Sequence, residues 1–142
     1  MKRYTVGFIF DSALEEVVLM EKNRPDWQKG KLNGIGGRVE EGESALECMV
    51  RETEEETGLA TSVEDWKRFA SIHESGGNVV DFFGLIHTGA KEEIQTTTDE
   101  QVDWYPAGAL PANALLNITW LIPMAIEKLG GGSFEPVEVT YT

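Results

Sequence analysis

Residues 34–59 read GIGGRVEEGESALECMVRETEEETGL, and this stretch decides how the rest of the chain is interpreted. It holds eight of the 25 acidic residues in the sequence. Ser44, followed three residues later by Glu47, forms a capping box, and Gly58 suits the left-handed residue that closes a helix. These signals predict a helix over residues 45–57. Side chains that recur at three- and four-residue steps predict its buried face: Leu46, Met49, Val50, Thr53 and Thr57.

Three glutamates crowd another face of this predicted helix. Glu52, Glu55 and Glu56 are spaced i, i+3 and i+4, so their carboxylates converge, and like charges at this spacing destabilise a helix by about 0.2–0.5 kcal/mol per pair. They also lie near the C-terminal end, where the helix dipole disfavours anions. A bound cation would offset both effects, and carboxylate oxygens suit Mg2+ or Mn2+ better than zinc. An acidic helix face that is simply solvated is the alternative.

The spacing of these residues resembles the signature of the Nudix hydrolases, Gly-x5-Glu-x7-Arg-Glu-U-x-Glu-Glu-x-Gly-U, in which U is a bulky aliphatic residue. All seven fixed positions are present: Gly37, Glu43, Arg51, Glu52, Glu55, Glu56 and Gly58. Thr53 departs from the pattern, and because it is β-branched and faces the core we expect slightly poorer packing without loss of chemistry. The resemblance implies one α/β domain over residues 1–142, a Nudix α/β/α sandwich with a mixed sheet between helices and the signature as a loop-helix-loop.

The resemblance also implies a hydrolase that cleaves a nucleoside diphosphate linked to another group, with Mg2+ or alternatively Mn2+ as cofactor. The implied catalytic residues are Glu43, Arg51, Glu52 and Glu56. The implied metal ligands are Gly37, Glu52, Glu55, Glu56 and Glu100. Glu100 belongs to a later polar loop from which relatives often supply a carboxylate; Glu93 is the reserve, and plain solvation of both is the alternative. Arg51 is expected to lie within reach of Glu47 and Glu54 and to orient Glu43.

The segment before the signature, Asn33 to Gly37, is dense in glycine, which lets a backbone approach a metal or phosphate closely. It is similar to a segment of the oxidised-purine nucleoside triphosphatases in which the asparagine hydrogen-bonds the base, and MutT-type relatives place a second asparagine at the start of the last helix. The resemblance therefore implies cleavage of a nucleoside triphosphate, such as 8-oxo-dGTP, to monophosphate and pyrophosphate. The substrate-binding residues expected on this basis are Trp27, Lys31, Asn33, Gly36, Arg38 and Asn117.

Each of these expectations has an alternative. Trp27 could cover the edge of the core, Asn33 could serve a turn, and Asn117 could act only as a helix N-cap. The basic residues could simply balance the acidic helix. The alternative functions are a broad nucleotide or nucleotide-sugar pyrophosphatase, of the ADP-ribose kind, and a Nudix module that senses a nucleotide without cleaving it.

Composition narrows the class of partner. The 142 residues carry a net charge of −13, and the 12 lysines and arginines form no basic stripe, which argues against a nucleic-acid polymer. The only cysteine, Cys48, makes a disulfide framework impossible and favours a reducing, cytoplasmic location. The apolar run after the N-terminus is too short for a signal sequence or membrane span. A small nucleotide is the expected partner, no membrane is expected, and a homodimer stays open.

The remaining segments predict further elements. Segments rich in aromatic and β-branched residues, bounded by turns, predict strands at 4–10, 17–21, 66–73, 79–87 and 102–105. Polar and glycine-rich segments predict loops at 22–31, 74–78 and 91–101. Residues 118–129 should form an apolar helix, with 133–142 adding an edge strand or fraying. His73 and His87 are expected to be structural.

Overall fold

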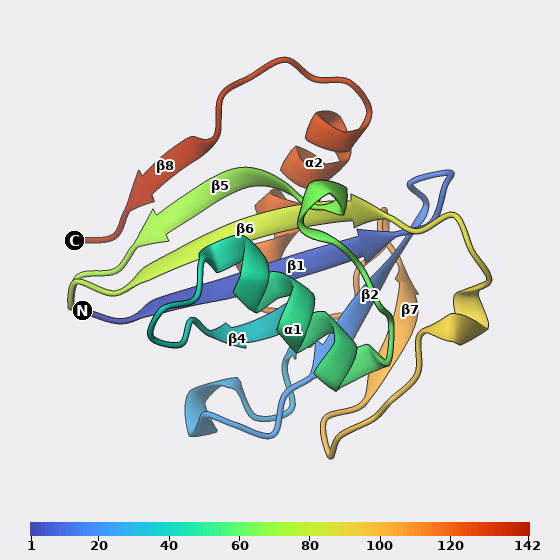
Figure 1. Ribbon diagram of the computed structural model, residues 1–142, viewed down its shortest axis with the longest axis horizontal. Helices are drawn as coiled ribbons and strands as arrows, with labels where there is room; N and C mark the ends of the chain where they lie inside the picture. Colours follow the sequence, from blue (N-terminus) through green and yellow to red (C-terminus); the bar gives the residue numbers. More distant parts are fainter.

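A mixed sheet divides the molecule, and one helix covers each of its faces (Figure 1). The computed structural model describes residues 1–142. The strands are β1 (Arg3–Phe10), β2 (Glu16–Glu21), β3 (Leu32–Asn33), β4 (Ile35–Arg38), β5 (Lys67–His73), β6 (Val79–Ile86), β7 (Val102–Pro106) and β8 (Val137–Thr140). The helices are α1 (Ala45–Thr57) and α2 (Ile118–Leu129), with short 3-10 turns η1 (Asp26–Gln28), η2 (Val63–Asp65) and η3 (Lys91–Glu93). The five predicted strands and both helices are therefore confirmed, with ends that differ by at most one residue. The predicted C-terminal edge strand is shorter than the segment 133–142, and β3 and β4 were not predicted.

The strands run in the order β3-β2-β1-β6-β5-β8, with β4 also paired to β1 and β7 to β2. β1 is parallel to β6 but antiparallel to β2 and β4, so the sheet is mixed, as predicted. The C-terminal tail supplies the edge strand β8, which pairs in parallel with β5. Pro106 ends β7 but still pairs with Glu16 of β2. The predicted α/β/α sandwich is confirmed.

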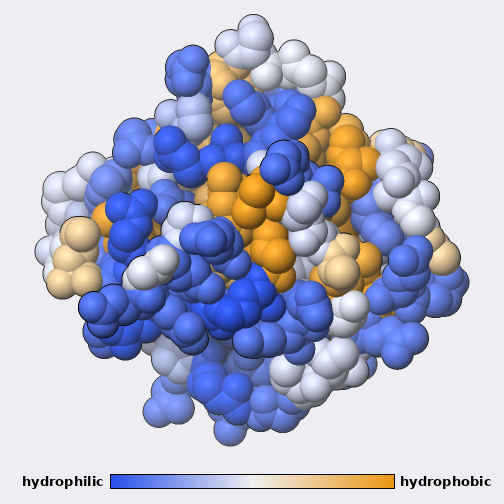
Figure 2. Space-filling model, viewed as in Figure 1, coloured by the Kyte–Doolittle hydropathy of each residue, from blue (hydrophilic) through white to orange (hydrophobic).

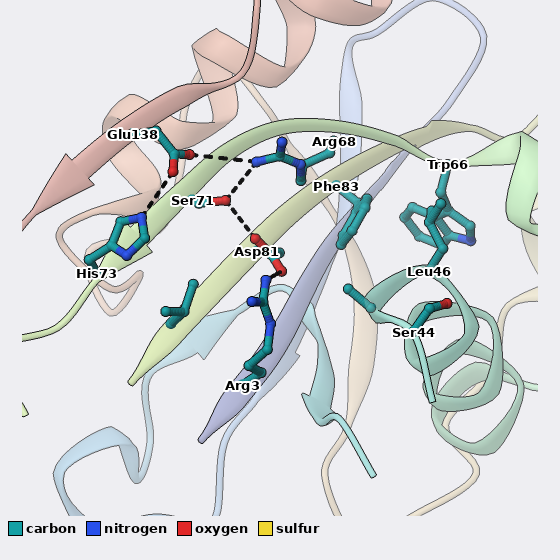
Figure 3. A pocket seen from close by; sticks show the side chains of 12 residues that line it. Arg3, Ser44, Leu46, Trp66, Arg68, Ser71, His73, Asp81, Phe83 and Glu138 are labelled. Carbon is teal, nitrogen blue, oxygen red and sulfur yellow. Dashed lines mark hydrogen bonds and ion pairs between the residues drawn. The ribbon is translucent and has the colours of Figure 1, made fainter. Parts of the chain in front are cut away.

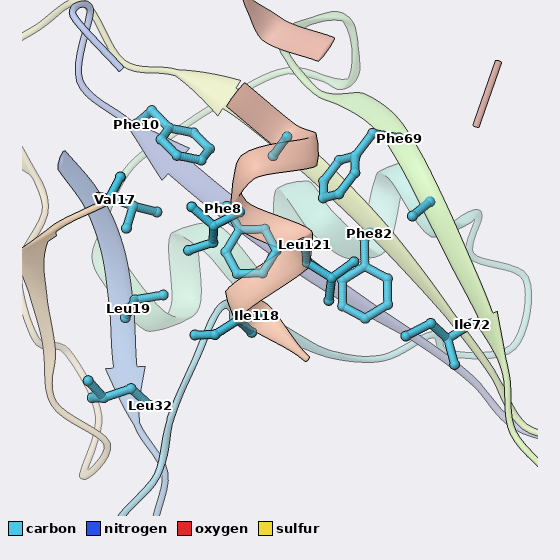
Figure 4. Close-up of a cluster of buried hydrophobic side chains, with 14 residues drawn as sticks. Phe8, Phe10, Val17, Leu19, Leu32, Phe69, Ile72, Phe82, Ile118 and Leu121 are labelled. Atoms are coloured by element: carbon cyan, nitrogen blue, oxygen red, sulfur yellow. The ribbon is translucent and has the colours of Figure 1, made fainter. Parts of the chain in front are cut away.

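Alternation along β1 explains why both faces of the sheet are covered. Phe8 and Phe10 lie in the cluster under α2, where the rings of Phe8, Phe69 and Phe82 lie 6.3 to 6.4 Å apart (Figure 4). Ile9, between them in sequence, points the other way into the cluster under α1. Successive strand residues face opposite sides, so one strand contributes to both cores. Burial of this apolar surface, at about 25 cal/mol per Å2, is the main force that holds each helix on the sheet.

Local signals set the ends of α1 as predicted. The Ser44 hydroxyl accepts a hydrogen bond from the Glu47 N–H at 3.0 Å, and the Glu47 carboxylate accepts one from the Ser44 N–H at 2.8 Å. Gly58 ends the helix with a φ of +78°. The predicted burial of Met49, Thr53 and Thr57 is confirmed, whereas Leu46 and Val50 are only half-buried.

The start of α2 corrects one prediction. Asn117 directly precedes α2, as predicted, but it has helical backbone angles and its side chain makes no capping hydrogen bond. A turn leads into the helix instead, because the Ile118 N–H donates to the Leu115 carbonyl at 3.1 Å. Pro123 lies in the second turn of the helix, and Gly130 follows its last residue.

The face that carries α1 is largely hydrophilic, with a patch of hydrophobic residues near its centre (Figure 2). No helix in this fold has the length and apolar character that crossing a membrane requires.

Candidate active site

Arg51 forms hydrogen bonds with three glutamates at the acidic face of α1 and in the loop before it. Its Nε and Nη2 donate to the two carboxylate oxygens of Glu43 at 2.8 and 3.1 Å, a forked arrangement that only a guanidinium can make. Its Nη1 donates to Glu52 at 2.8 Å and to Glu55 at 3.3 Å. The hydrogen bonds from Arg51 hold the pKa of Glu43 at about 2, and the same bonds raise the pKa of Arg51.

The contacts of Arg51 confirm part of the expected arrangement. It does contact Glu43, as predicted from the resemblance. The predicted reach to Glu47 and Glu54 is wrong, because Glu47 is engaged in the capping box and Glu54 is exposed, whereas Arg51 turns toward the loop before the helix. The catalytic roles of Arg51 and Glu43 stay predictions.

Glu52 packs against a glycine. A Cβ added to Gly37 would lie 2.6 Å from a carboxylate oxygen of Glu52, so a side chain at position 37 would displace the Glu52 carboxylate from this position. Burial raises the pKa of Glu52, and the Arg51 guanidinium opposes that effect without cancelling it. Glu52 therefore combines partial burial with a charged neighbour, a combination common at catalytic carboxylates.

Glu56 is buried, so the alternative of a simply solvated acidic face does not hold for this residue. It is 9% exposed, and its Oε1 accepts a hydrogen bond from the Gly36 N–H of β4 at 2.8 Å. Burial raises its pKa to about 8, and the negative charges of Glu52 and Glu100 add to the shift. Gly36 itself has a φ of +149°, and a Cβ there would lie 2.0 Å from the Thr5 carbonyl oxygen, so the close approach of β4 requires glycine.

The carboxylate oxygens of the predicted metal ligands suit a hard divalent cation, but these side chains do not converge on one metal position. No group of three or more His, Cys, Asp or Glu side chains is arranged to hold a metal ion. Glu52 and Glu55 turn toward Arg51, while Glu56 turns toward Gly36. Glu56 is nevertheless a buried carboxylate with other carboxylates nearby, and a cation is what would stabilise such a charge. The predicted ligand set, including the Gly37 backbone oxygen, stays a prediction.

Glu100 is buried beside the first residues of the loop that spans residues 22–31. Its carboxylate accepts hydrogen bonds from Lys22 Nζ at 3.1 Å, from the Asn23 N–H at 2.7 Å and from the Arg24 N–H at 3.3 Å. Burial acts to raise its pKa, but the Asn23 N–H and the Lys22 ammonium outweigh burial and lower it. Glu100 therefore anchors this loop; whether it also binds metal stays a prediction.

Glu93, the reserve candidate, lies elsewhere. Its carboxylate accepts from the Ala90 N–H at 2.8 Å at the start of η3 and lies 3.7 Å from His87 Nε2. It contacts no residue of the acidic helix face.

The anchored loop carries several of the predicted substrate-binding residues. Trp27 is 68% exposed, so the expectation that it covers the core edge is wrong: it stands out from η1. Lys31 and Arg38 are exposed as well, and neither side chain has an ion-pair partner. Asn33 is half-buried; its Oδ1 accepts from the Gly34 N–H at 2.8 Å and its Nδ2 donates to Gln28 at 3.3 Å. None of these four side chains forms a hydrogen bond or ion pair with a glutamate of α1.

Backbone contacts bring the segment before α2 beside this loop. The Leu115 N–H donates to the Leu32 carbonyl at 3.0 Å, and Asn113 Nδ2 donates to the Gly30 carbonyl at 3.1 Å. Asn117, two residues after Leu115, is half-buried and free of any capping bond. The two predicted base-reading asparagines thus come from segments that lie side by side.

Sequence reasoning missed Gln28 and Asn23 as members of this region. Asn23 contributes its backbone N–H to Glu100, a contact that any residue could make and that no sequence pattern can signal. Gln28 lies in a polar loop in which Trp27 and the basic residues were the only predicted ligand contacts, and a single glutamine there forms no pattern that signals a role.

A separate groove of about 470 Å3 opens beyond the N-terminal end of α1 (Figure 3). Trp66 and Phe83 form part of its floor, and none of the predicted site residues lines it. A chain of ion pairs and hydrogen bonds crosses it, with Arg3 on Asp81 at 2.7 Å and His73 on Glu138 at 2.9 Å. The acidic and basic side chains there balance one another, so the groove has no marked preference for an anion or a cation.

The sequence and the fold were compared with those of known proteins. The family model described as NUDIX domain matches residues 1–122. The human protein 8-oxo-dGDP phosphatase NUDT18 is 30% identical over 118 residues, which cover 76% of this chain and 33% of that protein. The chain thus spans about a third of the length of this curated relative.

Two solved structures show the same fold. A MutT/nudix family protein from Enterococcus faecalis superposes with a TM-score of 0.74 at 17% identity, over 91% of this chain and 62% of that one. The mutator MutT protein from Bacillus halodurans superposes with a TM-score of 0.70 at 20% identity, over 100% of this chain and 91% of that one. At these identities the likeness concerns the fold alone.

Proposed function

The chain belongs to the NUDIX domain family, and on that premise we propose that it is a divalent-metal-dependent hydrolase that cleaves a nucleoside triphosphate to a monophosphate and pyrophosphate. The observation that carries the proposal is the buried carboxylate of Glu56, bonded to the Gly36 N–H beside Glu52. A buried carboxylate beside a second, partly buried carboxylate costs stability that an apolar side chain in its place would not cost. It is therefore best explained by a function that needs the charge.

The metal would be Mg2+, with Mn2+ as the alternative, held by Glu52, Glu55, Glu56 and the Gly37 backbone oxygen, with Glu100 as a further carboxylate. When bound, it would neutralise charge on the phosphates and lower the pKa of a bound water. Glu52 is the first candidate for the base that accepts the proton of the attacking water, because burial raises its pKa toward the working range.

The other residues position these groups and the substrate. Arg51 holds Glu43 and Glu52 in place through hydrogen bonds of 2.8 Å to each. Lys31 and Arg38, both exposed and unpaired, would meet the phosphate chain. Asn33 and Asn117 would offer amides to the base, and the exposed ring of Trp27 would contact the ligand. An oxidised purine such as that of 8-oxo-dGTP is the proposed base.

A nucleoside diphosphate is the second candidate substrate. It is favoured by the name of the human relative, 8-oxo-dGDP phosphatase, which is 30% identical over 118 residues. Attack at the bond between the first and second phosphates would release a monophosphate from either substrate, together with pyrophosphate from a triphosphate and phosphate from a diphosphate.

We assign residues 123–142 to the same domain, although the family model ends at residue 122. The second half of α2 contributes Ala125 to the core, and β8 completes the sheet by pairing with β5.

A panel of nucleotides with Mg2+ tests the proposal. It should contain normal and 8-oxo purine triphosphates and diphosphates, pyrimidine triphosphates and ADP-ribose, with separate detection of phosphate and pyrophosphate. We expect pyrophosphate from a purine triphosphate and none in EDTA. Phosphate from a diphosphate alone would select the second candidate, cleavage of ADP-ribose would select a broad pyrophosphatase, and binding without any product would contradict catalysis.

A further inference from the structure

Gln28 touches the side chain that the proposed function assigns to base recognition. Its Oε1 accepts a hydrogen bond from Asn33 Nδ2 at 3.3 Å, across the loop that joins η1 to β3. Gln28 is half-buried, whereas Trp27 and Lys29 on either side are exposed. The one inward-facing side chain of this turn is thus the one that reaches Asn33.

The backbone holds Gln28 firmly in this place. Its N–H donates to the Pro25 carbonyl at 2.9 Å, and its carbonyl accepts from the Lys31 N–H at 2.8 Å. The loop is closed at its base, where the Lys22 N–H donates to the Lys31 carbonyl at 2.8 Å. The carboxylate of Glu100 anchors the same end through Lys22. The backbone of Gln28 is therefore fixed on both sides, and its side chain reaches Asn33 from a defined position.

Only one orientation of the side-chain amides of Asn33 and Gln28 is compatible with their hydrogen-bond partners. The Gly34 N–H can only donate, so the atom of Asn33 that faces it at 2.8 Å must be the oxygen Oδ1. The NH2 group of Asn33 is then the part that faces Gln28, and the atom that receives its hydrogen must be Oε1 of Gln28. A single backbone N–H thus sets the orientation of both side chains.

This arrangement leaves a defined set of groups for a ligand. Asn33 retains one N–H of its NH2 group and one lone pair of Oδ1, a donor beside an acceptor. Without Gln28, the NH2 group would have no partner in the chain and the side chain would be held at one end only. A fixed donor and acceptor pair discriminates between base edges far better than a rotating one, because the wrong base then leaves a polar group unpaired.

We propose that Gln28 is a positioning residue for base selection, which holds the Asn33 amide in the orientation that reads a purine edge. This inference rests on the proposed function, since it assumes that Asn33 contacts the base. In this role Gln28 acts through Asn33 and does not contact the phosphates of the substrate. The effect is therefore expected in KM and in the choice of base, with kcat and metal dependence little changed.

The experiment compares kcat/KM for the preferred purine triphosphate and for a pyrimidine triphosphate in three variants. Gln28→Leu removes the acceptor at similar size, and should reduce the purine-to-pyrimidine ratio about threefold to tenfold, the effect of one neutral hydrogen bond. Gln28→Glu keeps an acceptor for Asn33 Nδ2 and should retain most of the ratio, since any effect of its charge on the phosphates cancels between substrates. Asp26→Asn, an exposed change in the same turn, is the matched control and should leave the ratio unchanged.

A double variant separates action through Asn33 from an independent effect. Asn33→Ala combined with Gln28→Leu should show the same ratio as Asn33→Ala alone, because the positioning effect needs the amide. Equal losses for all nucleotides in Gln28→Leu, or losses that add fully in the double variant, would overturn the inference while leaving the proposed function in place.

The contact itself can be tested even if the proposed function fails. A wild-type protein without nucleotide hydrolysis or base preference would refute the proposed function. The side-chain NH2 signals of Asn33 in a 15N–1H spectrum should then still shift in Gln28→Leu and not in Asp26→Asn. Unshifted signals would overturn the positioning role directly, whatever the substrate.

Discussion

The Glu56 carboxylate and the Gly36 N–H are joined by a hydrogen bond of 2.8 Å, which ties the last turn of α1 to the glycine strand β4. The two residues are 20 positions apart in the sequence. The bond holds a buried carboxylate beside Glu52, where its charge is unfavourable for the fold and useful for a cation. It is the contact from which the proposed metal chemistry is best tested.

Glu56→Gln should abolish Mg2+-dependent turnover while the protein stays folded. The glutamine oxygen can still accept from Gly36, and removal of a buried charge relieves repulsion from Glu52. Mg2+ at about 100 times its Kd should stabilise the wild type by about 2.7 kcal/mol and the variant by much less. Thermal unfolding with Mg2+ and with EDTA measures the difference. Glu54→Gln is the control, because Glu54 is exposed on the same helix; an active Glu56→Gln enzyme would refute the metal assignment.

Asn33→Ala should lower kcat/KM for the preferred purine triphosphate and flatten the preference across bases, with metal dependence unchanged. A buried base edge left without its amide partner loses about 1–3 kcal/mol, or roughly tenfold to a hundredfold in specificity. Steady-state kinetics on purine and pyrimidine triphosphates measures this loss. If every substrate is slowed equally, Asn33 serves the turn through its bond to Gly34 and does not read the base.

Glu100→Gln should destabilise the protein in EDTA, where no metal role can contribute. The substitution leaves Lys22, whose side chain is 16% exposed, without its anionic partner, and weakens the hold on the loop that carries Gln28. Loss of one partner from a buried charged hydrogen bond costs about 1–3 kcal/mol. Urea unfolding gives this free energy, and KM for the nucleotide should rise in parallel. Asp99→Asn breaks an exposed ion pair with Arg24 and should have little effect; unchanged stability in Glu100→Gln would exclude the anchor.

Glu43 should make the protein sensitive to acid. Its pKa is about 2 in the folded protein, below the ordinary value of 4.5, because Arg51 bonds to the charged form. A lowered pKa stabilises the fold above pH 4.5, and this contribution is lost as the pH falls from 4.5 toward 2. Between pH 7 and pH 3, in EDTA, the free energy of unfolding should therefore fall more steeply for the wild type than for Glu43→Gln. Parallel curves for the two proteins would show that the Arg51 contact does not persist in solution.

The sequence by itself determined the elements that depend on neighbours along the chain. The capping box at Ser44 and the left-handed Gly58 bound α1 because their hydrogen bonds reach only three or four residues. Aromatic and β-branched segments located the strands. The spacing from Gly37 to Leu59 indicated the family, because that spacing records which residues share one helix and the loop before it.

Only the tertiary structure decided which side chains meet across the fold. Glu56 is buried because β4 has glycines where α1 packs against it. The loop that carries the exposed Trp27 is anchored by Glu100, which is far away in the sequence. The Gln28 and Asn33 amides face each other through the curvature of a loop with no periodic pattern. These contacts follow from how the sheet packs and where its loops are tied, and such long-range geometry leaves no periodic trace in the sequence around any one residue.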